Sequence, residues 1–413
     1  MGKSIRIDLM KTYGFRNRVV IPALSALFCY LFLGHVLLAD TSHYKELLIG
    51  DRGANMSGAY SAVADDATGA YHNPAGLVFG ARDSMVALSN ATNYVSNEYE
   101  DAVEDQAEEE EGWRYLINFA GYMKRFGDHV LGISYVIDDS VEVHQKQTFD
   151  NGLVLTKMGD DRTYKYGPSW AYRIDANLSV GVSLYLHHRE YYQHQNRLYN
   201  TKEETGAWTY TNTEGNEIGI HPIIGIMWSP IDTVSTSFVF KNTYFTHSAH
   251  YRQGGKKEND SATISHTEEM DKNYRKMPKE YTMGVAWFPS SYSLYTLDLN
   301  YFDIEADDKV DVLNIAMGLE IYISNKFVMR GGFFTNKDND ISPSSSTGNI
   351  EKIDMLGVST GISIFDGPTM ITAGAVFSLG SGKAQRDPTR PSEIQSVQRE
   401  VYSYSLAVSA AFD

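Results

Sequence analysis

The chain has 413 residues, of which 42% are hydrophobic and 12% aromatic, and its formal net charge is −16. The single cysteine, Cys29, excludes an internal disulfide and a zinc site built from thiolates. The acidic balance also argues against a nucleic-acid partner, because binding phosphates requires clustered lysine and arginine.

The first 39 residues predict a signal peptide. Basic residues precede an apolar run from Val19 to Leu38, which is the order typical of secretory signals. We expect cleavage after Ala39. The run is also long enough to span a bilayer, so an uncleaved anchor helix is the rival interpretation.

Residues 40–83 do not read as strands, because small residues dominate them. Such a segment can pack closely in a confined space, but it could not form a core alone. Two acidic residues and an Asn-Pro-Ala turn stand among the small ones, and the proline constrains that turn. The residues that define this segment are Gly53, Gly58, Asp65, Asp66, Asn73, Pro74 and Ala75.

From residue 84 onward the hydrophobicity alternates with a period of two. Between Leu313 and Ile323, for example, the odd positions are apolar and the even ones are mostly small or polar. Each such strand has one apolar and one small or polar face, as in a sandwich in water or a barrel in lipid. We predict fourteen strands, at 84–99, 113–124, 129–146, 162–173, 178–195, 216–229, 234–252, 279–289, 293–306, 309–323, 326–337, 350–365, 368–382 and 399–413.

The connections decide between these two folds. Short turns such as 174–177 and 229–232 alternate with long polar loops such as 147–161 and 196–215. Outer-membrane barrels sort their turns and loops in this way, whereas a soluble sandwich has no reason to do so. The sequence therefore predicts an all-β fold, a 14-stranded antiparallel transmembrane β-barrel over residues 84–413.

Other candidate features are weaker. Pro168 and Pro222 fall inside predicted strands, where a missing backbone donor favours a kink and could open a gap in the wall. The acidic stretch 98–111 is expected to be a solvated loop. No catalytic or metal-binding motif is present, and His187 and His188 are expected to point to opposite faces, so we predict no enzyme, metal or cofactor.

The small-residue run, with Ala-Asp-Asp at 64–66 and Asn-Pro-Ala at 73–75, resembles the N-terminal hatch of the FadL/TodX family of outer-membrane transporters. The resemblance implies a fourteen-stranded barrel plugged by residues 40–83, with Asn73, Pro74 and Ala75 in the hatch. It also implies passive inward movement of hydrophobic molecules such as long-chain fatty acids across the bacterial outer membrane, whose lipid would surround the barrel.

Similar hatch sequences occur in PorV-like barrels, which act as shuttles or anchors in a secretion system. A structural or secretion-partner barrel is therefore the alternative to a transporter, and an outer-membrane enzyme or general porin is a third possibility. The sequence leaves open the ligand, the oligomeric state and whether the hatch gates the channel or only plugs it.

Overall fold

The computed structural model describes residues 43, 47–100, 107–148, 152–200, 205–256, 267–271, 277–306, 309–344, 351–385 and 394–413. The predicted signal peptide lies outside these residues, so its cleavage stays a prediction. Within the described part of the chain, no helix is long and apolar enough to cross a membrane.

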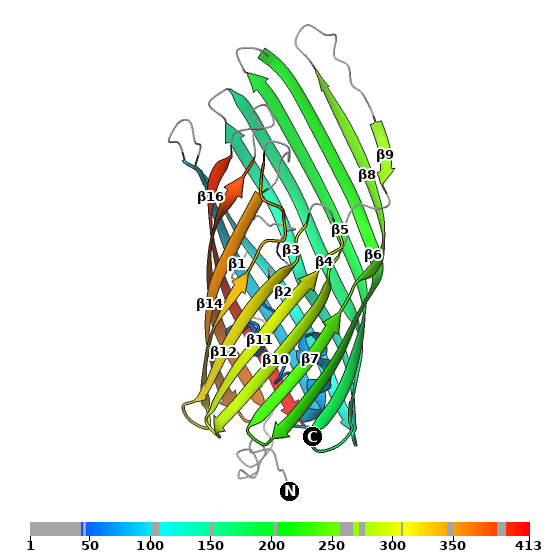
Figure 1. The fold of residues 1–413 in the computed structure, drawn as a ribbon, viewed down its shortest axis with the longest axis vertical. Coiled ribbons are helices and arrows are strands. Elements are labelled where there is room, and N and C mark those ends of the chain that lie inside the picture. The colour runs from blue at the N-terminus through cyan, green and yellow to red at the C-terminus, as the bar shows by residue number, and fades with distance from the viewer. Residues whose placement is uncertain are drawn as a thin grey trace.

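The described strands form one antiparallel sheet that closes on itself, with β1 paired to β16 and β5 paired to β6 (Figure 1). Their bounds are β1 Ser84–Glu100, β2 Ala107–Phe126, β3 His129–Thr148, β4 Leu153–Arg173, β5 Leu178–Asn200, β6 Thr205–Ile231, β7 Val234–Lys241, β8 Tyr244–Lys256, β9 Thr267–Asp271, β10 Lys279–Ser290, β11 Ser293–Asp303, β12 Val312–Tyr322, β13 Phe327–Asn336, β14 Glu351–Asp366, β15 Thr369–Ala384 and β16 Gln395–Phe412.

These segments make fourteen wall strands. β7 and β8 both pair with β6 and continue one another across residues 242–243. β9 pairs with β8 and β10 pairs with β7, so these two also share one position in the wall. The predicted fourteen-stranded antiparallel barrel is confirmed, and the strand predicted at 234–252 is interrupted at residues 242–243.

The two faces of each strand have opposite chemistry. In β12, Leu313 and Met317 are 45% and 50% exposed on the outer surface, whereas Asn314 and Glu320 are buried in the lumen. An outward apolar face is stable only in contact with lipid, and a polar interior is typical of membrane barrels. The barrel is therefore built to span a bilayer.

One side of the barrel is much taller than the other. β4, β5 and β6 have 21, 23 and 27 residues, against 11, 11 and 10 in β11, β12 and β13 (Figure 1). Most of the predicted loops 147–161 and 196–215 are therefore strand. The acidic loop predicted at 98–111 is also wrong in part, because residues 107–111 extend β2 and pair with β1.

Two neighbouring strands separate in their upper parts. β2 and β3 pair from Phe126 and His129 only as far as Phe119 and Val136. A β-bulge lies directly above this last pair on each side, with Asn118 as the extra residue in β2 and Asp138 in β3. Bulges bend strands, so β2 and β3 diverge. We call the facing edges, 107–118 and 137–148, the seam.

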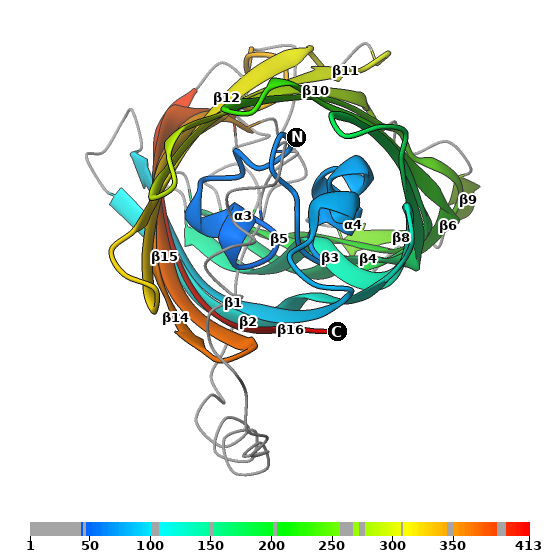
Figure 2. The ribbon, with the colours of Figure 1, turned by 90° about the horizontal axis from the view of Figure 1, so that it is seen from below.

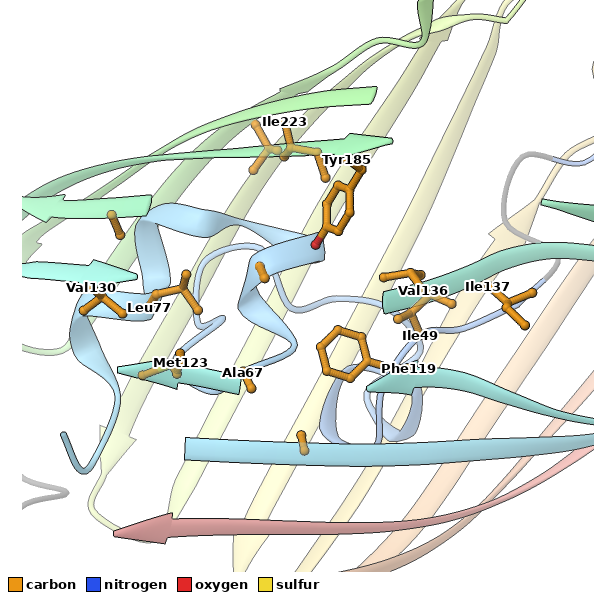
Figure 3. Close-up of a cluster of buried hydrophobic side chains, with 14 of the residues drawn as sticks. Ile49, Ala67, Leu77, Phe119, Met123, Val130, Val136, Ile137, Tyr185 and Ile223 are labelled. Carbon is orange, nitrogen blue, oxygen red and sulfur yellow. The ribbon is translucent and has the colours of Figure 1, made fainter. Parts of the chain in front are cut away.

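The N-terminal segment, residues 47–83, lies inside the barrel. It contains α3 (Arg52–Asn55), α4 (Gly69–His72) and the 3-10 helix η1 (Pro74–Phe79), and Figure 2 shows α3 and α4 within the ring of strands. Its apolar side chains share a buried cluster with the wall, as Leu77 does with Met123 and Ile49 with Phe119 (Figure 3).

Candidate functional site in the barrel lumen

Pairs of wall glycines let the N-terminal segment approach the barrel closely. Gly181 of β5 faces Gly225 of β6, and Gly361 of β14 faces Gly374 of β15. A Cβ atom on Gly181 would overlap the backbone of Pro74 and Ala75, and one on Gly374 would overlap the side chain of Asn55. The wall therefore has recesses shaped for this segment.

The predicted turn Asn73-Pro74-Ala75 occupies the first of these recesses. Asn73 accepts a hydrogen bond from the Ala75 amide over 3.1 Å and donates one to the Ser61 carbonyl over 2.8 Å. Pro74 is the first residue of η1, where a missing N–H has no cost. Ser179 of β5 donates to the Ala75 carbonyl over 2.9 Å, which fixes the turn to the wall.

Gly53 and Gly58, the two glycines predicted to define the segment, have separate local roles. Gly58 has a φ of +80°, a left-handed conformation that favours glycine. A Cβ on Gly53 would lie 2.8 Å from Nε2 of His72, so this glycine lets α3 pack against α4.

A buried charge network joins α3 to the wall strands β12 and β13. The Arg52 guanidinium donates to both carboxylate oxygens of Glu320 in β12, over 2.6 and 2.8 Å, and also pairs with Asp65. Arg330 of β13 donates to the same Glu320 over 2.7 Å. Burial alone would lower the pKa of Arg52, but the charges of Asp65 and Glu320 raise it well above its usual value.

The negative charge of Asp66 is less well compensated by its neighbours than the charge of Asp65. Its carboxylate accepts hydrogen bonds from the Tyr60 hydroxyl over 2.9 Å and from the Thr68 amide over 2.8 Å. Burial and the charge of Asp51 nevertheless raise the pKa of Asp66 to about 6. Asp65 and Asp66, adjacent in sequence, therefore differ, since Asp65 is neutralised by an arginine and Asp66 has mainly neutral donors.

Several wall residues that hold the segment were not predicted. Asp298 of β11 accepts hydrogen bonds from the amides of Tyr60 and Ser61, over 3.1 and 3.0 Å. Glu320 and Asp298 are almost fully buried. The sequence does mark such residues, because each is a charged residue at a lumen-facing position of an alternating strand. The alternation does not indicate which residue each of them contacts.

A pocket of about 50 Å³ lies between the start of the N-terminal segment and the wall formed by β1 and β13–β16. Leu47 and Leu48 line one side, and apolar wall residues including Val376 and Val401 line the other. Arg399 marks a polar end, where it donates to Asn97 and Glu351 over 2.7 and 2.8 Å. The lining as a whole is mainly apolar, with nine apolar side chains against two asparagines, three serines and the one charged residue, Arg399.

The lumen wall of β4–β6 carries a second set of buried ion pairs. Arg189 donates to Asp161 over 2.8 Å and pairs with Glu217, which is 3.2 Å from Nε2 of His187. His187 is buried, whereas His188 on the opposite face is not. Within the described ranges, no group of three His, Cys, Asp or Glu residues could hold a metal ion.

The two predicted kink residues flank the same position of β5. Pro222 of β6 pairs with Leu184, and its carbonyl accepts a hydrogen bond from Asn242, where the wall strand β7–β8 is interrupted. Pro168 pairs with Ile133 of β3, but on its other side the pairing of β4 with β5 skips Gly167 and Pro168 without a change of register. The long loss of pairing lies instead at the seam.

Comparison with solved structures identifies the fold. The toluene transporter TodX of Pseudomonas putida matches with a TM-score of 0.69 and 14% identity, over 88% of this chain and 98% of that one. A FadL homologue of Pseudomonas aeruginosa matches with a TM-score of 0.65 and 11% identity, over 92% and 100% of the two chains. The chain therefore has the fold of the FadL/TodX transporters, which confirms the resemblance in its sequence.

Sequence comparison adds no closer relative. No family model matches the chain, and no curated protein matches it. At these low identities the likeness concerns the fold, and the function has to be argued from the site.

Proposed function

We propose that this protein is an outer-membrane channel for the passive uptake of hydrophobic molecules such as long-chain fatty acids. The observation that carries the proposal is the pocket between Leu47–Leu48 and the wall, whose lining is mainly apolar and carries one charged residue, Arg399. An amphiphile would bury its chain there at about 0.8 kcal/mol per methylene. Two structural neighbours, TodX and CymD, are a toluene transporter and a monoaromatic hydrocarbon channel.

In this proposal the N-terminal segment is a hatch that must shift before the ligand can pass. The pocket of about 50 Å³ is smaller than the ~150 Å³ cavity that accommodates benzene in another protein, so it admits only part of a ligand in this state. Since Leu47 and Leu48 form one wall of the pocket, movement of the segment would enlarge it. The seam offers a path outward into the membrane.

The double variant Asn73→Ala/Pro74→Ala tests the hatch. It removes the hydrogen bond from Asn73 to the Ser61 carbonyl, the bond that Asn73 accepts from the Ala75 amide, and the proline that shapes the turn. We expect purified protein to lose co-extracted lipid, measured by mass spectrometry, and cells to take up oleate at an altered rate. Pro368→Ala, in an exposed turn, is the control. Unchanged lipid and uptake in the double variant would contradict a gating hatch.

Two other outcomes would favour a different function. A wide aqueous conductance for small ions in planar bilayers would contradict a hydrophobic channel. Co-purification of a secreted or periplasmic partner, without any uptake of lipid, would support the PorV-like interpretation.

A further inference from the structure

Arg399 is the one charged side chain among the described residues that line the pocket. It lies on the lumen face of β16 and is 7% exposed. A buried guanidinium without a counter-charge would attract the head group of an ionised ligand, because charge-assisted hydrogen bonds to carboxylates are strong. The groups that surround Arg399 therefore decide which head group the pocket accepts.

Glu351 of β14 neutralises this guanidinium. Nη2 of Arg399 donates to Oε1 of Glu351 over 2.8 Å, and Nε donates to Oδ1 of Asn97 in β1 over 2.7 Å. The second carboxylate oxygen, Oε2, accepts a hydrogen bond from the Tyr99 hydroxyl over 3.1 Å. Both oxygens of Glu351 are thus engaged, and the carboxylate is held against Arg399 from a strand two positions away in the wall.

The ion pair lies beside buried apolar side chains. Tyr99 shares a buried cluster with Ile353 and Val397, which are 0% and 1% exposed and follow Glu351 and precede Arg399 by two residues. Charges interact more strongly in such surroundings than in water. A ligand carboxylate bound to Arg399 would share the guanidinium with Glu351, and the two negative charges would repel one another.

The pocket also offers a polar group that carries no charge. Asn93 of β1 lines the pocket, is 9% exposed, and its Oδ1 atom has no hydrogen-bond partner among the described residues. A buried acceptor without a partner costs free energy, so a ligand that supplies a donor is favoured there. A hydroxyl or a protonated carboxyl group supplies a donor, whereas a carboxylate supplies only acceptors.

We propose that Glu351 determines the head-group specificity of the pocket. By neutralising Arg399, it makes the pocket select un-ionised amphiphiles, such as long-chain alcohols and protonated fatty acids, over carboxylates of the same chain length. A carboxylate would give up its hydration without meeting a cation that lacks a counter-charge. The inference rests on the proposed function, since it takes the pocket as the ligand site, and it narrows the ligands to those without charge.

Equilibrium dialysis of the protein in lipid nanodiscs tests this specificity, with empty nanodiscs as the reference. The probes are 1-decanol and decanoate at pH 8, where the carboxylic acid is ionised. Glu351→Gln keeps the shape of the side chain and an acceptor for Arg399, but it removes the negative charge. We expect this variant to bind decanoate at least about tenfold more tightly than the parent does, and 1-decanol equally well.

Glu400→Gln is the matched control. Glu400 is the neighbour of Arg399 on the opposite, exposed face of β16, so its substitution changes the net charge of the protein equally without altering the pocket. Its affinity for decanoate should equal that of the parent. An unchanged decanoate affinity in Glu351→Gln, or an equal gain in Glu400→Gln, would overturn the inference.

Decylammonium provides a test in the parent protein that does not depend on the folding of a variant. A pocket with balanced charge should bind decylammonium and decanoate with affinities that agree within about tenfold. A larger difference in either direction would overturn the inference, because it would mean that one charge of the pair dominates. If 1-decanol does not bind above the level of empty nanodiscs, the proposed function fails together with the inference. If 1-decanol binds, only the inference is at stake.

Discussion

Arg52 shows how a single side chain can fix the N-terminal segment to the wall. Its guanidinium binds Glu320 through two nitrogens, and both groups are buried. A buried pair contributes little relative to an apolar replacement, but removing one partner leaves an uncompensated charge. The residue therefore matters less for the stability of the barrel than for where the segment is held.

We predict that Arg52→Ala releases the segment. Breaking a buried ion pair costs about 3–5 kcal/mol, although Arg330 still neutralises part of the Glu320 charge. Hydrogen exchange of residues 50–80 should then be much faster than in the parent. Arg82→Ala, which removes an exposed pair with Asp413, should cost about 0–1 kcal/mol and leave exchange unchanged. Equal rates of hydrogen exchange in both variants would show that the charge network does not hold the segment in place.

The raised pKa of Asp66 predicts that docking of the N-terminal segment inside the barrel depends on pH. The pKa of Asp66 is about 6 in the docked segment against 3.8 normally, because of burial and the charge of Asp51, with Arg52 and Asp65 also nearby. The docked segment therefore binds the proton of Asp66 more tightly than the released segment does. The stabilisation that this proton gives to docking is fully present below about pH 3.8 and is lost as the pH rises through about 6.

Hydrogen exchange, corrected for the intrinsic effect of pH, should show stronger protection of residues 60–72 at pH 5 than at pH 7.5. Asp66→Asn should abolish this difference, because the amide stays neutral at both values. A difference that survives the substitution would assign the effect to another group.

At the scale of elements, the glycine recesses decide how closely the segment docks. Gly331 and Gly332 of β13 are adjacent and point to opposite faces. A Cβ on Gly332 would lie 2.7 Å from the Ser57 hydroxyl, whereas one on Gly331 would meet only the Ser359 carbonyl at 3.4 Å. Such close packing explains why a wall rich in glycine surrounds a segment rich in small residues.

We expect Gly181→Ala to displace the Asn73–Ala75 turn, because the added methyl group overlaps backbone that cannot rotate away. Overpacking of this kind typically costs about 1–3 kcal/mol. Limited trypsin digestion should then cleave at Arg52, which is buried in the parent protein. Gly331→Ala is the matched control and should stay resistant. Resistance of both variants would mean that the turn tolerates the methyl group.

Strand prediction succeeded where the apolar alternation is regular and failed where it fades. In β12 the alternation marked both the strand and its outward face, because lipid requires every second residue to be apolar. In the upper parts of β4–β6 the apolar alternation fades, as in the wholly polar run 193–197, although the hydrogen bonding continues. The predicted ends therefore fell short where the alternation fades.

At the scale of the whole molecule, the apolar outer surface determines the environment of the barrel. We predict that Met317→Arg, at the centre of β12, destabilises the folded barrel by about 2–4 kcal/mol, because the charge would face hydrocarbon. Ile323→Arg, on the same side beyond the end of β12, should cost about 0–1 kcal/mol. Reversible urea unfolding in lipid vesicles measures both, and equal costs would contradict a membrane band at this height.

The barrel, its fourteen wall strands and the separate character of the small-residue segment can be predicted from the sequence, because period-two alternation, short turns and glycine content are local properties of the chain. Which residues contact one another is set by the tertiary structure. Arg52 and Glu320 are 268 positions apart, and the seam follows from bulges at Asn118 and Asp138. Such contacts depend on strand register and barrel closure, which no local pattern encodes.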